Sequence, residues 1–271
     1  MMPPARRSLR SLAAVLAAGA AVAAPRAARA DGDGDGDDHD ATTTADAAAH
    51  AAESGAFLAS ALAARSDGRR GLVSILGGYD QVRHGGVYDA TAEAQLLGPL
   101  SLRAGASYDG PGTSSSPHLE LRLDTLRQGS HGIDLAIAGG YTGASFNDVP
   151  AAVLKVALGR SVGASYLLAN LTYEHGLEDG ERAGELRLAA LYPVGHGAHV
   201  GLDSRFQVDL ERGGHDPAGE TEWEWRSGMV ASYAWDRFVL TGSGGVSALR
   251  LHGTATTALG PAVMAGLGTV F

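Results

Sequence analysis

The chain has 271 residues, a formal net charge of −9, a hydrophobic share of 45% and no cysteine. The acidic balance argues against a nucleic-acid partner, which would require a basic surface. The lack of cysteine excludes disulfides and thiolate metal sites. Glycine contributes 39 residues, well above its average share of about 7%, and this excess favours tight turns and strongly curved sheet over helix.

Residues 1–30 have the features of a secretory signal peptide. A basic start around Arg7 precedes the apolar residues 12–24, which are too few to cross a bilayer as a helix. Ala28 and Ala30 fit the small-x-small rule, so we expect export across a bacterial inner membrane and cleavage after Ala30. Because five arginines lie in this leader, the mature chain would carry 16 basic and 30 acidic residues, a formal charge of −14.

Residues 31–70 divide into an acidic part and an alanine-rich part. Residues 31–40 read DGDGDGDDHD and contain nothing to bury, so we expect them to be flexible and disordered. Residues 45–65 are rich in alanine and are expected to form a short helix. The sequence leaves open whether this helix lies in solution or inside the structure that follows it.

From residue 71 onward, apolar and polar residues alternate in stretches of about ten residues. In residues 118–124 (HLELRLD), three leucines alternate with three charged residues. Successive side chains of a strand point to opposite faces, so one face is apolar and the other is charged. The pattern predicts about twelve strands, near 71–79, 87–97, 100–108, 118–127, 132–141, 151–159, 164–174, 182–192, 198–209, 220–233, 237–248 and 257–271.

The predicted connections alternate between short turns, such as Gly98-Pro99, and longer polar loops, such as residues 109–117. Short turns at one end and longer loops at the other are typical of outer-membrane barrels. A strand of about ten residues suits a tilted crossing of the bilayer, and closing the strands into a ring removes edges that lipid cannot tolerate. An even number of strands would leave both termini of the barrel segment on the periplasmic side.

Residues 71–271 therefore resemble a bacterial outer-membrane β-barrel protein of the porin-like class. The resemblance implies an all-β fold, a closed antiparallel transmembrane β-barrel of about 12 strands, located in the outer membrane and surrounded by its lipid. Barrels of this class commonly end in a Phe that the barrel-assembly machinery reads. Gly266 and Phe271 occupy the positions of that signal, whereas Thr269 departs from the apolar or aromatic residue often found there.

The faces of the strands decide between a membrane barrel and a secreted soluble β-barrel or sandwich. A membrane barrel turns its apolar face to lipid and its charged face to the lumen, and a soluble barrel does the reverse. Alanine and glycine on both faces leave little bulk for a soluble core, which favours the membrane barrel. The predicted lumen-lining residues are then Glu93, Arg103, Glu120, Arg122, Asp124, Asp134, Lys155, Glu185, Arg187, Asp203, Arg205, Asp209, Glu222, Glu224 and Arg226.

The sequence contains no G-x-S-x-G elbow, Walker A loop or H-E-x-x-H motif, so we expect no enzyme, no cofactor and no bound metal. The charged interior predicts a small porin-like channel or transport barrel for small solutes, with the acidic excess favouring cations or neutral solutes. Twelve strands lie between the eight that side chains fill and the sixteen that enclose an aqueous channel. Three alternatives stay open: a structural or interaction barrel with a packed polar interior, an export barrel with a helix plug, and a lipid-modifying barrel enzyme.

Overall fold

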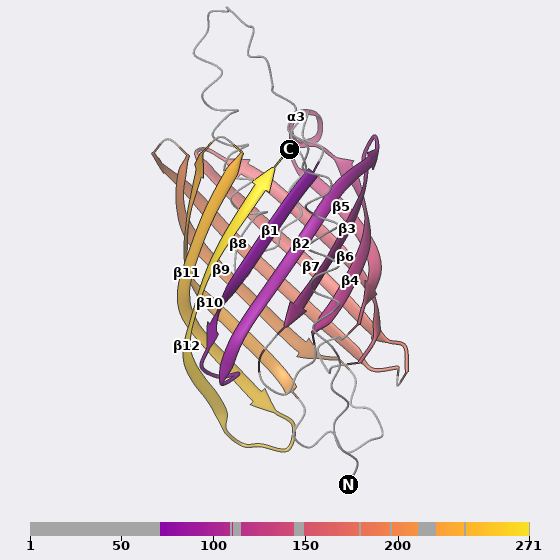
Figure 1. Ribbon diagram of the computed structural model, residues 1–271, viewed down its shortest axis with the longest axis vertical. Helices are drawn as coiled ribbons and strands as arrows, with labels where there is room; N and C mark the ends of the chain where they lie inside the picture. The colour runs from indigo at the N-terminus through magenta and orange to yellow at the C-terminus, as the bar shows by residue number, and fades with distance from the viewer. Residues whose placement is uncertain are drawn as a thin grey trace, which may run out of the picture.

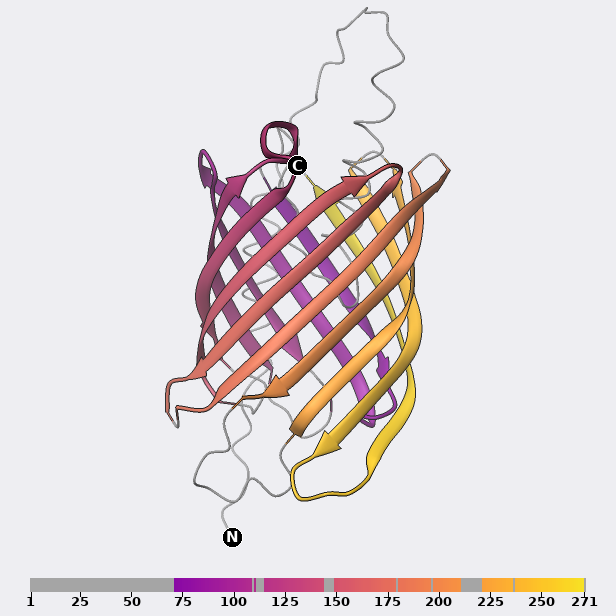
Figure 2. The same cartoon turned by 180° about the vertical axis from the view of Figure 1, so that it is seen from behind.

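The computed structural model describes residues 71–108, 110, 115–143, 149–178, 180–195, 197–210, 221–235 and 237–270. These residues form twelve strands and one short helix (Figures 1 and 2). The elements are β1 (Gly71–Asp80), β2 (Gly85–Leu97), β3 (Leu100–Tyr108), β4 (Ser116–Leu126), α3 (Gln128–His131), β5 (Asp134–Thr142), β6 (Ala151–Val162), β7 (Ser165–Gly176), β8 (Arg182–Gly195), β9 (Ala198–Asp209), β10 (Thr221–Trp235), β11 (Phe238–Leu251) and β12 (Thr257–Val270).

The strands form one closed antiparallel barrel, as the sequence predicts. Each strand pairs with its neighbours in sequence, and β12 closes the ring by pairing with β1. The closing register runs from Leu72 opposite Val270 to Asp80 opposite Ala262. Figures 1 and 2 show the strands tilted relative to the barrel axis on both sides of the ring, as closure of a twisted sheet requires. No strand of the described barrel is left with an unpaired edge.

The predicted strand bounds agree with the observed ones to within three residues. The sequence does not predict α3, because its four residues look like an ordinary turn. This single helical turn ends at Gly132, whose φ of 76° is a left-handed conformation that glycine adopts without strain. The backbone N–H of Gln128 donates to the carboxylate of Asp134 at 2.7 Å, which ties the turn to the start of β5.

Several predictions fall outside the described residues. The signal peptide over 1–30, the acidic segment and helix within 31–70, and Phe271 all belong to this group. None of the helical residues in the described ranges forms a span long and apolar enough to cross a membrane.

The apolar faces of the strands point outward. Leu119, Leu188 and Leu202 are 51%, 46% and 63% exposed, whereas Arg122 on the opposite face of β4 is 1% exposed. A soluble barrel would show the opposite distribution, because water would solvate its charges and its leucines would form the core. The outer wall is therefore the lipid-facing surface of a membrane-spanning barrel.

The two ends of the barrel differ in their connections. One end has five connections, of which four are two-residue turns and the fifth contains α3. We call it the turn end, and it also holds the start of β1 and the end of β12 (Figure 1). The opposite end, with six connections, is called the loop end. At the turn end, the rings of Tyr233, Trp235 and Phe238 stack with centroids 5.9 and 5.8 Å apart, and Arg237 lies 5.3 Å above the ring of Phe238. Aromatic rings at this level are typical of a membrane interface.

A charge on the outer wall tests whether lipid surrounds the barrel. Leu171, at the middle of β7 and 59% exposed, is changed to Arg; Leu259, 72% exposed but close to the loop end of β12, is the control. We expect Leu171→Arg to reduce the free energy of unfolding from phospholipid vesicles by about 2–4 kcal/mol, and Leu259→Arg by no more than about 1 kcal/mol, because the cost rises with depth in the bilayer. Equal effects of the two substitutions would contradict a lipid-facing wall.

Candidate channel lumen

The inner wall of the barrel carries the charged faces of the strands. Side chains that lie opposite one another on paired strands share a face, so the buried members of each strand lie together inside the ring. Eight of the predicted lumen-lining residues are no more than 6% exposed: Glu93, Arg103, Glu120, Arg122, Glu185, Asp203, Glu224 and Arg226. The other seven are partly buried: Asp124, Asp134, Lys155, Arg187, Arg205, Asp209 and Glu222.

The first group of ion pairs extends across β2, β4 and β6. Arg122 lies at its centre, with Nη1 3.2 Å from Oε1 of Glu93 and Nε 2.8 Å from Oδ1 of Asp124. Lys155 Nζ lies 2.8 Å from Oε1 of Glu120. The guanidinium of Arg122 and the ammonium of Lys155 each find carboxylates on a strand that is not a direct neighbour in the sheet.

Small residues on the intervening strands allow these long contacts. Lys155 reaches Glu120 past β5, where Ala138 and Gly140 occupy the inward positions. A Cβ at Gly140 would lie 2.1 Å from the carbonyl oxygen of Leu119 and 2.9 Å from Cγ of Glu120, so a larger residue would displace the carboxylate. Glycine and alanine on the inner wall therefore leave room for ion pairs between strands that are not adjacent.

The second group lies on β8 and β9 and centres on Glu185. Arg187 Nε is 2.5 Å from Oε1 of Glu185, and Arg205 Nε is 2.6 Å from Oε2 of the same carboxylate. Arg205 also donates to Oε1 of Gln207. One buried carboxylate thus neutralises part of the charge of two guanidinium groups. Removal of this carboxylate would take a counter-charge from both arginines.

The third group closes part of the loop end, and sequence analysis identified only half of it. Arg226 Nε lies 2.9 Å from Oδ2 of Asp80, and Ser247 donates to Oδ1 of Asp80 at 2.7 Å. Arg226 and Arg83 both form ion pairs with Glu224. The predicted lumen set did not include Asp80 and Arg83, but Asp80 is completely buried.

These contacts show that two connections at the loop end lean over the barrel mouth. Arg83 belongs to the turn between β1 and β2, yet its partner Glu224 lies on β10, a quarter of the ring away. His252, between β11 and β12, places Nε2 3.0 Å from Oδ2 of Asp209 at the end of β9. Val82 is buried in the same turn as Arg83, and its N–H donates to Asp80 at 2.9 Å. The mouth is therefore narrower than the strands alone would make it.

Asp134 and Glu222, two further residues of the predicted lumen set, lie at opposite ends of the barrel. Asp134 is near the turn end, where the hydroxyl of Tyr166 donates to it at 3.3 Å. Glu222 lies at a β-bulge at the loop end of β10 and forms a 3.0 Å ion pair with Arg250. Because Arg250 pairs in register with the lipid-facing Trp223, and because the side chains of Glu222 and Arg250 are 27% and 40% exposed, this pair lies at the outer rim.

The inner wall carries many polar side chains but no candidate metal site among the described residues. Within the described ranges, no three His, Asp or Glu side chains are grouped so that they could hold a metal ion. The wall instead presents carboxylates beside basic groups, mainly on β2 to β6 and on β8 to β10. Such a wall offers donors and acceptors to a passing solute and keeps the local net charge small.

Comparison with solved structures finds porins with a similar fold. The NanC porin superimposes with a TM-score of 0.52 at 9% sequence identity, covering 73% of this chain and 98% of that porin. This chain has a porin fold. The KdgM porin (TM-score 0.46, 9% identity, 74% of this chain and 99% of that chain) and an anion-selective porin from Comamonas acidovorans (0.37, 12%, 68% and 59%) superimpose less well. No protein-family model matches the sequence, and no curated protein matches it.

Substitution of Glu185 tests whether water solvates the charged groups of the inner wall. We expect Glu185→Gln to reduce the free energy of unfolding by roughly 3 kcal/mol, because two guanidinium groups lose a buried counter-charge. Glu222→Gln, which breaks a half-exposed pair at the rim, should cost less than about 1 kcal/mol. Urea titration of the protein folded in vesicles measures both values. Equally small losses would mean that water solvates the Glu185 group as well as it solvates the rim.

Proposed function

We propose that the protein is a small porin-like channel of the bacterial outer membrane that passes small polar solutes. One observation carries the proposal: a closed twelve-stranded barrel with the porin fold has leucines on its outer wall and charged side chains on its inner wall. Polar groups on the inner wall can replace part of the hydration of a polar solute as it crosses the barrel.

The balance of charge on the inner wall indicates the class of solute. Without Glu222, which lies at the outer rim, and with Asp80 and Arg83, which the structure adds, the predicted set becomes nine carboxylates and seven basic side chains. Most of these carboxylates and basic groups are held in ion pairs with one another, so the charge that remains in the lumen is the small acidic excess. The proposed channel therefore favours cations and neutral polar molecules over anions.

A second candidate, a structural barrel with a packed polar interior, is favoured by a specific observation. The printed ion pairs are close, and eight charged side chains are no more than 6% exposed. Charges that pair this closely fill space as well as line it. The structural barrel and the channel differ in one measurable respect, which is whether ions cross the folded protein.

The remaining parts of the proposal concern delivery to the membrane. Residues 1–30 would direct export, with cleavage after Ala30, and residues 31–70 would form an acidic flexible segment and a short helix. Gly266, with Phe271, would present the signal read by the barrel-assembly machinery. The outer-membrane lipid would then surround the wall that carries Leu119 and Leu202.

Planar-bilayer recording on refolded protein tests the channel. We expect discrete conductance steps and, in a salt gradient, a reversal potential that indicates a preference for cations. Changing Arg83 to Ser should increase the single-channel conductance, because Arg83 holds the turn between β1 and β2 over the mouth.

Arg250→Ser is the matched control for Arg83→Ser, since it removes the same charge at the same end but from the outer rim. Its conductance should equal that of the unchanged protein. If the unchanged protein shifts on heating in gel electrophoresis, as a folded barrel does, but gives no conductance steps, the channel is excluded and the packed structural barrel takes its place.

A further inference from the structure

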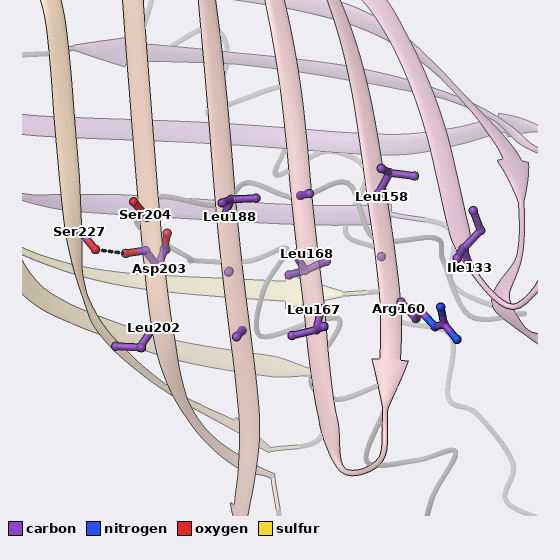
Figure 3. A pocket seen from close by; sticks show the side chains of 14 residues that line it. Ile133, Leu158, Arg160, Leu167, Leu168, Leu188, Leu202, Asp203, Ser204 and Ser227 are labelled. Atoms are coloured by element: carbon purple, nitrogen blue, oxygen red, sulfur yellow. Dashed lines mark hydrogen bonds between the residues drawn. The ribbon is translucent and has the colours of Figure 1, made fainter.

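The outer wall contains a groove that the channel does not use. It has a volume of about 650 Å³ and crosses β6 to β10 in the half of the barrel nearer the turn end (Figure 3). Its volume falls within the range of roughly 300–1,000 Å³ that is typical of ligand pockets. Its sides are formed by the lipid-facing leucines Leu158, Leu167, Leu188 and Leu202.

The groove exists because small residues stand between large ones on adjacent strands. Ala169 lies in register between Leu158 and Leu188, and Ala190 lies in register between Leu167 and Leu202. The alanines leave a depression that the leucines border.

Two serines continue the floor of the groove, and their hydroxyls are engaged within the sheet. Trp225 Nε1 donates to Oγ of Ser204 at 3.2 Å. Ser227 donates to the carbonyl oxygen of Asp203 at 3.2 Å, as the dashed line in Figure 3 shows. The floor is therefore almost entirely apolar in spite of its serines.

A positively charged side chain, that of Arg160, lies at one end of this apolar groove. Arg160 lines the groove, is exposed, and lies on the outward face of β6 two residues before the strand ends at the turn end. Within the described ranges, its guanidinium has no ion pair and no hydrogen bond. The site is held firmly, because Gln128 of α3 accepts from the backbone N–H of Ser161 at 2.6 Å and so fixes the adjacent backbone of β6.

From this arrangement we infer that the groove binds a glycerophospholipid, with one acyl chain along the leucines and alanines and the phosphate on Arg160. An arginine on a lipid-facing wall is costly unless it reaches an anion at the interface. A phosphate gives the guanidinium a charge-assisted, bidentate partner, while the acyl chain fills the depression that the alanines leave. The turn end of such a barrel faces the periplasmic leaflet, where phospholipid headgroups lie at the level of Arg160.

A second copy of the chain fits this groove less well. Neighbouring barrels in a membrane share one orientation, so only residues at the turn end of a neighbour could reach Arg160. Among the described strand residues, no outward-facing carboxylate lies at that end; Glu222, the one on the rim, lies at the loop end. The described strands of a second copy would therefore leave the guanidinium without a counter-charge, whereas a phospholipid supplies it.

Native mass spectrometry of the refolded protein with dioleoylphosphatidylglycerol as the probe tests this inference. We expect one tightly retained lipid per chain, and about tenfold weaker retention of dioleoylglycerol, which has the same chains without the phosphate. Arg160→Gln should weaken retention of the phospholipid about tenfold and leave retention of the diacylglycerol unchanged. Arg237→Gln, which removes an exposed arginine at the same end but outside the groove, is the matched control and should have no effect.

A second pair of variants tests the groove itself. Ala190→Phe fills the floor and should abolish retention of both lipids, whereas Ala265→Phe, at an exposed outward position on β12, should not. Heat-shift gels confirm that each variant is folded, and the arginine pair decides the question if a phenylalanine variant fails to fold. Equal retention by all variants would show that lipid binds nonspecifically around the barrel, and this result would overturn the inference. A dimer that added lipid does not dissociate would also overturn it. Neither result depends on whether the barrel conducts ions.

Discussion

The pairing of β12 with β1 is the constraint on which the rest of the structure depends. Backbone N–H and C=O groups cannot bind water inside a bilayer, so every one of them must find a partner within the sheet. Closure of the ring meets this requirement for all twelve strands at once. It also leaves each side chain only two places, the lipid or the lumen, and the alternation of the sequence decides between them.

Closure places the charged faces of the strands in a confined space, where each charge must be compensated by its neighbours. The structure achieves this by mixing signs within reach of one another, as Glu185 does with two arginines. It also uses small residues as spacers, as Gly140 does beside Glu120. The same glycine and alanine positions that weaken a conventional apolar core thus make an ion-paired inner wall feasible.

The strands and their faces could be predicted from the sequence because each strand of this fold can be interpreted by itself. Lipid packs against any apolar face and requires no complementary protein surface. The alternation within a stretch such as residues 118–124 is therefore enough to show which of its side chains face the lumen. The contact of Arg83 with Glu224 could not be predicted, because closure and curvature bring a turn after β1 within reach of β10. The position of Glu222 depends on a bulge, which no residue of the sequence indicates.

The lumen and the lipid groove lie on opposite faces of the same strands, so the two proposals can be separated by substitution. On β9, Asp203 points to the lumen while Leu202 and Ser204 border the groove, and the same alternation runs through β7 and β8. A change of charge on one face alters the other face only through the backbone between them. The hydrogen bond from Ser227 to the carbonyl of Asp203 is one such link. Because the backbone is fixed by pairing on both sides, a substitution at Arg160 or Ala190 should change lipid retention without changing conductance, and a substitution at Arg83 should do the reverse.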